Sequence, residues 1–550
     1  MQLLKNRKLI EKEEIQNFLE PDYSAHSHDP FLFNNMQAAV DVVIKHIKAQ
    51  NKIVIYGDYD ADGVTSSVLL VEIFSLFKAD VEPYIPGRVD EGYGLNKNAV
   101  KEIAKKGRKL IITVDCGIRS RDEIEFAKSL GIEVIVTDHH FASEDKEERP
   151  NCLIVCPSLP EENYPFKYLA GVGVAFKLAL ALIKKSKLSD EQKILLEEKV
   201  LDLVAVGTVS DCVILLGENR LLVKKGLEEL NKNRRLGLVK LMEVARINNK
   251  ILDAWNIGFQ IGPRINAAGR MEHAHYAFEL FMAKEEPEAE KLAEKLNNLN
   301  ADRQKTTEEI MAEVETQIKN KKQDSLIIGI CESEENAWNE GVTGLVAGRI
   351  CEKYYRPVLI ITKTEDGYKG SGRSIEDFNI IEAVEECGEF LDKYGGHPAA
   401  CGFSFSEKNK DAFLEKIKKI AADKLDKMEL KPKIHIDAEL ELAEIGEELL
   451  KEIEKFAPFG QGNHKPKFIS YKAQIKDIMI MGVESQHIKF RFNGFWAISF
   501  NGSENLKEFK VGDFVDIVYY IDRNDFNGRS EIQLKIVDMK NNNSNDANQN

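Results

Sequence analysis

Between Lys52 and Pro157 the chain alternates short apolar runs with segments of helical periodicity, and this alternation restricts the fold more than any other feature. The predicted strands are "KIVIY", "DVEPYI", "KLIITVD", "IEVIVTD" and "CLIVC". β-Branched runs of this length indicate buried strands, and helices between them indicate crossover connections. The pattern therefore predicts an α/β fold with a doubly wound, mostly parallel sheet.

We expect further domains in the rest of the chain, because 550 residues are too many for one hydrophobic core. The stretch 285–322 is rich in Glu, Lys and Ala, which indicates a solvated helix bridging two domains, with a binding role as the alternative. From about Lys431, roughly five short strands separated by Gly and Asn turns are typical of an OB-type β-barrel. The predicted boundaries are 1–50 for an N-terminal segment, 51–284 for the first α/β domain with a helical part, 285–322 for the connecting helix, 323–428 for a second α/β domain, 429–540 for the barrel and 541–550 for a disordered tail.

The composition is that of a soluble globular protein, with 43% hydrophobic and 30% charged residues. The start "MQLLKNRKLIEKEE" lacks the apolar core of a signal peptide, and no apolar run approaches the ~18 residues of a membrane span. Eight scattered cysteines without zinc-ligand pairing predict a reduced, cytoplasmic protein. The net charge of −15 argues against indiscriminate coating of nucleic acid, but it does not exclude a nucleic-acid enzyme whose carboxylates hold cations.

Carboxylates and histidines follow three of the predicted strands. They are Asp58, Asp60 and Asp62 after "KIVIY", Asp115 at the end of "KLIITVD", and Asp138, His139 and His140 after "IEVIVT". Ligand sites in open parallel sheets lie beyond the carboxyl ends of the strands, so these side chains should point into one crevice. Asp211 in "GTVSDCV" follows a helical segment whose end can return to the same crevice. A single Asp after a strand is commonly a turn or helix cap, but clusters after three strands indicate a metal site.

The spacing of "GDYDADG" also matches the opening of an EF-hand loop, but that loop needs a preceding helix and a bidentate Glu at its twelfth position, which here is Leu69. Instead, the alternation should direct the three aspartates toward one crevice, with Gly63 opening the following helix. Oxygen ligands with imidazole favour manganese or magnesium over structural zinc. Because several carboxylates repel one another, we expect two divalent cations roughly 4 Å apart, an arrangement common in phosphoester hydrolysis. Asp115, on a central strand, is the predicted bridging ligand.

The motifs carry a resemblance to a known family. "GDYDADGVTS", "VDCG", "TDHH" and "GTVSD" occur in the order and approximate spacing of the four motifs of the DHH phosphoesterase superfamily. The later "IGPRINAAGR", "WNEGVTGLVAGRI", "GSGRS" and "YGGHPAACGFSF" resemble the RecJ branch, the single-strand-specific 5′ exonucleases, and "FAPFGQGNHKPKF" resembles the lead-in to its OB fold. The resemblance covers about Asp29 to Met539.

The resemblance implies roles for the residues of the crevice. The implied metal ligands are Asp58, Asp60, Asp62, Asp115, His139 and Asp211. One cation would lie near Asp60 and Asp115, and the other near Asp62, Asp115, His139 and Asp211. Asp58 would either bind a cation directly or lie behind the residues that do. His140 would contact the scissile phosphate or polarise the site. The catalytic set is then Asp60, Asp62, Asp115, His139, His140 and Asp211.

A second group of residues has the chemistry of phosphate binding. In "GPRINAAGR", Arg264, Asn266 and Arg270 stand among small residues, and arginine suits planar phosphate oxygens; the alternative is a helix-capping loop with surface arginines. "GSGRS" and "GGH" join flexible glycines to Arg373 and His397, although a lone histidine is more often packed or capped. The resemblance implies a substrate clamp between the two α/β units that contains Arg373, Gly395, Gly396 and His397.

Two further features qualify the resemblance. Asn339 in "WNEG" replaces a histidine that is usual in the family, and an amide cannot titrate, which questions any acid–base role at this position. In the barrel, Phe490, Phe492, Phe495 and Trp496 stand amid Lys489 and Arg491. We expect at least half of these aromatic side chains to be barrel core, while the remainder could stack on bases.

The sequence thus predicts a manganese- or magnesium-dependent 5′-to-3′ exonuclease that releases 5′-mononucleotides from single-stranded DNA in repair and recombination. The alternatives are a DHH-type hydrolase of short oligonucleotides or cyclic dinucleotides, and a non-catalytic single-strand-binding scaffold. The barrel weighs against the first alternative, and the complete ligand set weighs against the second. The resemblance adds a single-strand binding protein and a helicase as partners, and we expect a monomer without membrane association.

Overall fold

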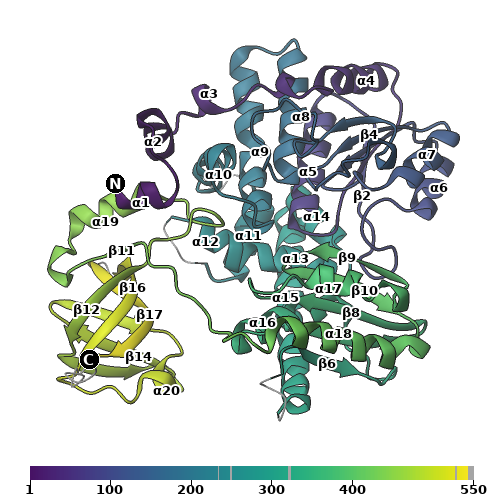
Figure 1. Ribbon diagram of the computed structural model, residues 1–550. Helices are drawn as coiled ribbons and strands as arrows, with labels where there is room; N and C mark the ends of the chain where they lie inside the picture. The colour runs from purple at the N-terminus through teal and green to yellow at the C-terminus, as the bar shows by residue number, and fades with distance from the viewer. Residues whose placement is uncertain (233–234, 248–250, 320–323, 527–528, 543–550) are drawn as a thin grey trace.

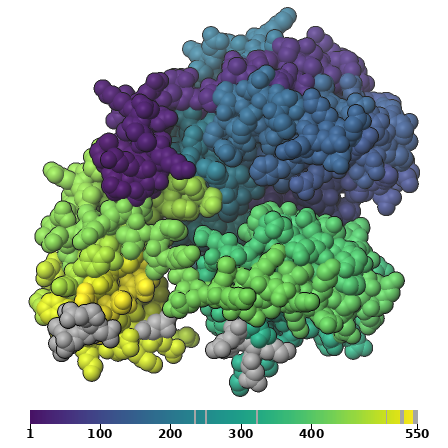
Figure 2. Space-filling view, in the orientation of Figure 1, coloured from purple at the N-terminus to yellow at the C-terminus, as the bar shows by residue number. Residues whose placement is uncertain are grey.

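The computed structural model describes residues 1–232, 235–247, 251–319, 324–526 and 529–542. Within these residues the strands form three sheets, of five, five and seven strands. Figure 1 shows them in three separate parts of the molecule, and the space-filling view in Figure 2 shows the boundary between the blue first part and the green second part crossing the front. Most of the predicted tail, 541–550, lies outside the described residues.

The first sheet confirms the predicted parallel arrangement. Its order is β2-β1-β3-β4-β5, and every neighbouring pair is parallel. The strands are β1 (Ile53–Tyr56), β2 (Val81–Tyr84), β3 (Leu110–Val114), β4 (Glu133–Thr137) and β5 (Leu153–Val155). All five strands that the apolar runs predict are therefore present.

Helices cover both faces of this sheet, as a doubly wound fold requires. Ile53 and Ile55 of β1 belong to the core that contains α4 (Met36–Lys48), α5 (Ala61–Leu76) and α8 (Gly171–Lys185). The intervening residues Val54 and Tyr56 pack on the other face. There they contact the core formed with α6 (Lys97–Lys105) and α7 (Arg121–Ser129). The apolar run that forms α8 is buried from Gly171 to Ile183, as its composition predicts.

A helical part follows, in α9 (Asp190–Ser210), α10 (Gly217–Leu230), α11 (Leu236–Val244), α12 (Ala254–Asn256), a π-helical turn (Ile257–Ile261), α13 (Gly262–Met271) and α14 (His275–Met282). The long helix α15 (Glu286–Gln317) then joins the two α/β parts. Its first half packs on the first core through residues up to Leu299, and its second half packs on the next core from Ile310. The connecting helix is thus amphipathic and contributes to both cores.

The second α/β part has a mixed sheet in the order β6-β7-β8-β10-β9. Only β6 and β7 run parallel, and the other neighbours are antiparallel. The strands are β6 (Ile327–Cys331), β7 (Val358–Thr364), β8 (Gly367–Arg373), β9 (Lys393–His397) and β10 (Ala400–Phe405). Their helices are α16 (Glu340–Tyr354), α17 (Ile380–Glu385) and α18 (Lys410–Leu425).

The C-terminal part is the predicted β-barrel, with more strands than the sequence indicated. Seven strands replace the expected five or so, because a two-residue strand joins one edge and a hairpin extends the other. They are β11 (Ala438–Glu439), β12 (Phe468–Gln474), β13 (Asp477–Met481), β14 (His487–Phe492), β15 (Phe495–Ser499), β16 (Phe514–Phe526) and β17 (Arg529–Asn541). Helices α19 (Glu447–Glu454) and α20 (Ser503–Leu506) accompany them.

The N-terminal helices α1 (Gln2–Asn6) and α2 (Lys12–Leu19) lie against the lead-in to this barrel, as Figures 1 and 2 show. Arg220 of α10 links the three segments: its guanidinium donates to the carbonyls of Phe18, Lys455, Phe456 and Pro458 at 2.8–3.3 Å. It also lies 4.2 Å from the centroid of the Phe18 ring and is 2% exposed. This junction attaches the barrel to the helical part.

Candidate metal centre

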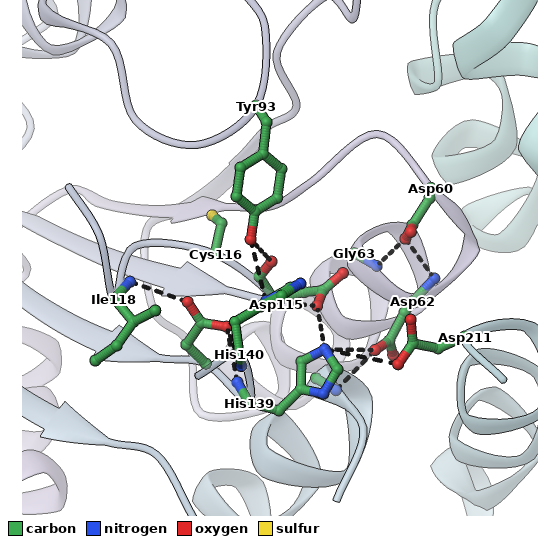
Figure 3. Close-up of polar contacts among 12 residues, drawn as sticks. Asp60, Asp62, Gly63, Tyr93, Asp115, Cys116, Ile118, His139, His140 and Asp211 are labelled. Atoms are coloured by element: carbon green, nitrogen blue, oxygen red, sulfur yellow. Dashed lines mark hydrogen bonds and ion pairs between the residues drawn. The ribbon is translucent and has the colours of Figure 1, made fainter. Parts of the chain in front are cut away.

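The predicted metal ligands meet at the carboxyl edge of the first sheet (Figure 3). Asp58 and Asp60 follow β1, Asp115 follows β3, and His139 follows β4. Asp211 reaches the same place from the C-terminus of α9. Three groups have ligand atoms within 4.8 Å of one another: Asp58, Asp60 and Asp115; Asp62, His139 and Asp211; and Asp115, His139 and His140.

The "GDYDADG" loop brings its aspartates together by a helix start rather than by strand alternation. Asp60 is the N-cap of α5, and its carboxylate accepts from the backbone N–H groups of Asp62 and Gly63. Asp62 already lies in the first helical turn. A side chain at Gly63 would meet the Asp58 backbone at 2.6 Å, so only glycine lets the helix start so close to the loop. The expectation of an alternating loop was therefore wrong, although all three carboxylates reach the crevice.

Helix α8 positions two of the carboxylates. The backbone N–H groups of Gly171 and Val172 donate to Asp62 at 2.7 and 2.8 Å. Such donors at a helix N-terminus stabilise a carboxylate. A Cβ at Gly171 would lie 2.7 Å from the Asp115 side chain, so the absence of a side chain there makes room for Asp115. Asp115 itself has φ 58°, a left-handed conformation that aspartate tolerates better than most residues.

His139 lies among three carboxylates at distances that suit a shared cation. Its Nε2 atom is 3.1 Å from Asp115 Oδ1, 3.6 Å from Asp211 Oδ2 and 4.0 Å from Asp62 Oδ2. Ligands of an octahedral ion with bonds of about 2.1 Å are separated by about 3.0 Å when adjacent and about 4.2 Å when opposite. The spacing of these four groups falls within that range.

The ligand atoms also lack other partners. None of the described residues offers a hydrogen bond to Asp58 Oδ1, Asp115 Oδ1, His139 Nε2 or Asp211 Oδ2, although all four atoms are buried. Buried polar atoms are otherwise almost always satisfied, so each calls for a missing partner. A divalent cation fits this donor set, because it is bound by carboxylate oxygen and imidazole nitrogen alike.

The electrostatics point the same way. Burial, and then the charges of neighbouring aspartates, hold the pKa of Asp58, Asp115 and Asp211 well above the ordinary value. Burial and the charge of Asp60 raise the pKa of Asp62 to about 7. Burial, followed by the charge of His140, lowers the pKa of His139 to about 4, which keeps its imidazole neutral and able to bind a metal. Cations in the crevice would offset the repulsion among the carboxylates.

His140 is held by a different set of contacts. Its Nδ1 atom lies 2.8 Å from Asp138 Oδ1 and 3.1 Å from the Tyr93 hydroxyl. Asp138 is fully buried and accepts from the backbone N–H groups of Ile118, His139 and His140, so it shapes the loop rather than facing the crevice. Burial opposes a charge on His140, but the hydrogen bond to Asp138 and the nearby aspartates outweigh it and raise its pKa.

An arginine cluster borders the metal centre, and one member of it was not predicted from the sequence. Arg270 is half-buried, and desolvation followed by the charges of Arg88 and Arg303 lowers its pKa to about 9. Burial lowers the pKa of Arg373, and Arg88 adds to this shift. Arg88, the unpredicted member, lies 4.7 Å from the centroid of the Tyr59 ring and also acts electrostatically on Asp58.

Arg88 and Tyr93 lie in "PGRVDEGY", directly after β2. The rule that located the other ligands, which searches the carboxyl ends of parallel strands, would have found this loop as well. It was overlooked because the stretch contains neither a histidine nor paired aspartates of the kind that marked the other loops.

Two predicted substrate-binding residues in α13 have structural partners. The Asn266 side chain accepts from the backbone N–H of Ala61 at 2.7 Å, so it supports the start of α5. Arg264 points toward α15, where it donates to Asn297 at 3.0 Å, and it also donates to the Gln260 carbonyl. The structure brings Asn266 to the metal loop and turns Arg264 away from it.

Two of the proposed clamp residues of the second part, Arg373 and His397, share one row of its sheet. Ala400 of β10 pairs with Arg373 of β8 on one side and with His397 of β9 on the other. Gly396 has φ 154°, and a side chain there would meet the Ala400 carbonyl at 2.2 Å, while Gly395 faces open space. On the same face as Arg373, a cavity of about 330 Å³ is lined by Lys369, Ser371, Lys393, Tyr394 and Gly402 among others.

Asn339 caps a helix, and its amide does not titrate. It is the N-cap of α16, and its side chain accepts from the backbone N–H of Gly341 at 2.8 Å. The Gly341 carbonyl in turn accepts from Arg270 at 2.8 Å. The start of α16 is therefore hydrogen-bonded to a member of the arginine cluster.

In the barrel, the aromatic residues divide as expected. Phe490 and Phe492 are fully buried, whereas Phe495 and Trp496 are half-buried. The guanidinium of Arg491 lies 5.8 Å from the Trp496 ring centroid. Half of the four aromatic residues are therefore barrel core.

Models of three protein families match the chain. The DHH family N-terminal domain matches residues 52–208, the DHHA1 domain matches 323–423, and the RecJ OB domain matches 436–538. Each range coincides with one of the three sheets. Among the described residues, no helix combines the length and apolar character needed to cross a bilayer.

Curated relatives match over nearly the whole chain. The single-stranded-DNA-specific exonuclease RecJ of Bacillus subtilis (strain 168) is 37% identical over 93% of this chain, which spans 64% of that relative's length. The RecJ protein of Haemophilus influenzae is 34% identical, with 96% of this chain and 95% of the relative covered. The crystal structure of Thermus thermophilus RecJ in complex with Mn²⁺ has a TM-score of 0.82 at 28% identity, covering 98% of this chain and 75% of that one.

The metal prediction agrees with these relatives, because the Thermus thermophilus protein is also known in complex with Mg²⁺, at a TM-score of 0.76 and 28% identity over 98% of this chain and 74% of that one. The predicted resemblance and fold class are both confirmed. With three matching family models and a 34% identical relative aligned over 95% of its length, the chain belongs to the RecJ family of single-stranded-DNA-specific exonucleases.

Proposed function

We propose that the chain is a metal-dependent exodeoxyribonuclease that degrades single-stranded DNA from its 5′ end and releases 5′-mononucleotides. The observation that carries the proposal is the divided ligand set, in which four buried ligand atoms lack hydrogen-bond partners among the described residues and Asp115 takes part in two of the three groups. Asp115 can thus bridge two cations.

The ligands divide between two cations in this proposal. Asp58, Asp60 and Asp115 would hold one of them, while Asp62, His139 and Asp211 would hold the other, with Asp115 available to both. Bound cations supply a water nucleophile with a lowered pKa and stabilise the charge on the attacking and leaving oxygens. The chain orients its own ligands through the N–H groups of α8 and the amide of Asn266.

The phosphate groups are bound by side chains next to this centre. Arg88, Arg270 and Arg373 present positive charge beside the carboxylates, and an arginine cluster compensates the charge of a phosphodiester backbone. His140, kept in place by Asp138, contacts the scissile phosphate. Gly395, Gly396 and His397 complete the clamp from the second sheet.

The barrel favours a long single strand over a short substrate. OB folds bind extended single strands, and an enzyme for dinucleotides needs no such module. The complete ligand set favours an enzyme over a non-catalytic scaffold. A cytoplasmic monomer that works in repair and recombination with a single-strand binding protein and a helicase remains a prediction of the resemblance.

The test is digestion of end-labelled single and double strands with Mn²⁺ or Mg²⁺, and with a chelator as the control. Release of labelled mononucleotides from a 5′-labelled single strand at the earliest times is the expected result. Cleavage from the 3′ end, equal cleavage of duplexes, or activity in the presence of chelator would each contradict the proposal. Hydrolysis limited to very short oligonucleotides would favour the alternative hydrolase.

A further inference from the structure

Two aromatic side chains lie on the solvent side of the helix that leads to the metal centre. Trp255 and Phe259 are 55% and 69% exposed. Their rings stack with centroids 5.5 Å apart and planes inclined by 26°. Side chains of this size are normally buried, and a contiguous exposed pair is a common mark of a binding site.

The opposite face of the same helix is fully buried. Asn256, Ile257 and Ile261 have no exposed surface, so the helix is firmly packed. Asp253 and Asn256 form a capping box at its start. The two rings are therefore held in place by a rigid helix, although they cover no core of their own.

This helix runs directly to the catalytic residues. Gly258 lies against Val209, and Gly262 lies against Ser210, the residue before Asp211. Further along, Asn266 binds the start of α5. Phe259 precedes Asn266 by seven residues, which is about 10 Å along a helix axis. The segment that carries the aromatic pair is thus close in sequence to the part of the helix that contacts the metal loop, and Figure 1 shows α12, which contains Trp255, on the side of the helical part toward the barrel.

A π-helical turn sets the position of the pair. The turn spans Ile257–Ile261, between Trp255 and the start of α13. Such turns insert one residue and are frequent at functional sites. Residues four apart lie on one face, so the turn and the spacing bring both rings to the same surface.

We propose that Trp255 and Phe259 form a stacking platform for the nucleobases of the single strand that approaches the metal centre. This inference rests on the proposed exonuclease function. An unpaired base offers its π-face to an aromatic ring, whereas a paired base is stacked within its duplex, so the platform favours single strands.

The platform would add to the aromatic surface of the barrel, where Tyr471 and Phe500 are 53% and 57% exposed. Phe490 and Phe492 are fully buried and cannot reach a base. Trp496 is half-buried beneath Arg491. Stacking on one ring strengthens binding by about 5-fold to about 150-fold per base.

The experiment uses the full-length protein and a ladder of variants. W255A/F259A removes both rings, W255L/F259L keeps apolar side chains without rings, and W255F/F259Y keeps two rings. Each is assayed with Mn²⁺ on a normal single strand and on a strand of equal length that lacks bases near its 5′ end. Melting curves verify that each variant is folded.

We expect the alanine and leucine pairs to raise KM for the normal strand by about tenfold or more, with kcat within about twofold of the parent. The aromatic pair should retain the parent KM, and the abasic strand should be insensitive to all three changes. A parent-like KM for the leucine pair, or equal losses on normal and abasic strands, would overturn the platform. A parent-like KM for the leucine pair would indicate instead that the exposed side chains bind another protein.

A second measurement separates this inference from the proposed function. In chelator, where no hydrolysis can occur, quenching of Trp255 fluorescence by an oligothymidylate is followed in a W496F background. Quenching that disappears in the added W255F change supports stacking even if the parent proves not to be an exonuclease. A parent that degrades single strands without any Trp255 quenching would refute the platform and leave the exonuclease proposal intact.

Discussion

The contact between Gly171 and Asp115 allows a sharp test of the metal centre. A Cβ added at Gly171 would lie 2.7 Å from the Cβ and from Oδ1 of Asp115. Carbon atoms in contact are about 3.5 Å apart, so Gly171→Ala must displace the Asp115 side chain by about 0.8 Å. The backbone of Asp115 cannot relax easily, because the Tyr93 hydroxyl donates to its carbonyl at 3.1 Å.

The expected loss follows from this displacement. Overpacking of a buried site costs about 1–3 kcal/mol of stability, and a shift of about 1 Å in a catalytic group costs about 100-fold in rate. We therefore expect Gly171→Ala to lower kcat by about 100-fold with Mn²⁺, while binding of a single strand in chelator stays near the parent value.

The matched control is Gly348→Ala, a helical glycine of α16 whose added Cβ meets nothing within 4 Å. That change should leave kcat unchanged and stabilise the protein by about 0.5–1 kcal/mol, because alanine favours the helix. Rates come from initial velocities on a labelled single strand, and stability comes from denaturant melting. A Gly171→Ala variant with a kcat within twofold of the parent would refute the reasoning.

Three further changes test other parts of the structure. Asp115→Asn keeps a residue that tolerates φ 58° but removes the carboxylate proposed to be shared by both cations. The change should abolish hydrolysis, and it should also abolish the rise in melting temperature that Mn²⁺ gives the parent. A melting temperature that still rises with Mn²⁺ would contradict the bridging role. Arg88→Ala should raise KM for DNA at least tenfold without altering metal-dependent melting, and an effect on melting alone would place Arg88 in the metal site instead. Arg220→Ala leaves buried carbonyls unpaired at a cost of about 2–4 kcal/mol, and Arg220→Lys should not rescue it, because one ammonium cannot reach four acceptors. Limited proteolysis between the second α/β part and the barrel should then accelerate; cleavage at the parent rate would show that the junction does not hold the barrel.

Local sequence patterns were sufficient for the strands and for the residue types of the site. β1, β3 and β4 are short runs rich in β-branched side chains, and their burial follows from composition alone. The meeting of the aspartates and histidines at one place could be predicted because parallel strands place their carboxyl ends at one edge of the sheet. Asp58, Asp115 and His139 followed from that rule without knowledge of any distant contact.

Residues that act through distant segments could not be predicted in the same way. The aspartates of "GDYDADG" were expected to reach the crevice through alternation after the strand, but Asp60 instead caps α5, whose start is held by Asn266 and by the N-terminus of α8. Nothing within the local sequence of Gly171 reveals that Asp115 occupies the space of its missing side chain. Arg88 follows β2, where the rule of strand ends applies, but only the folded structure shows that its charge acts on Asp58 and Arg270.

The parallel sheet, the barrel and the carboxylate-rich edge could be predicted from residue order alone, because periodicity and residue type act over a few neighbouring positions. The folded arrangement was needed to establish which carboxylates can share a cation, which arginines face them, and how Arg220 attaches the barrel. These outcomes depend on contacts between segments far apart in the chain, such as the 202 residues between Phe18 and Arg220. Such contacts form only when the cores of the separate parts pack together, and no local pattern records them.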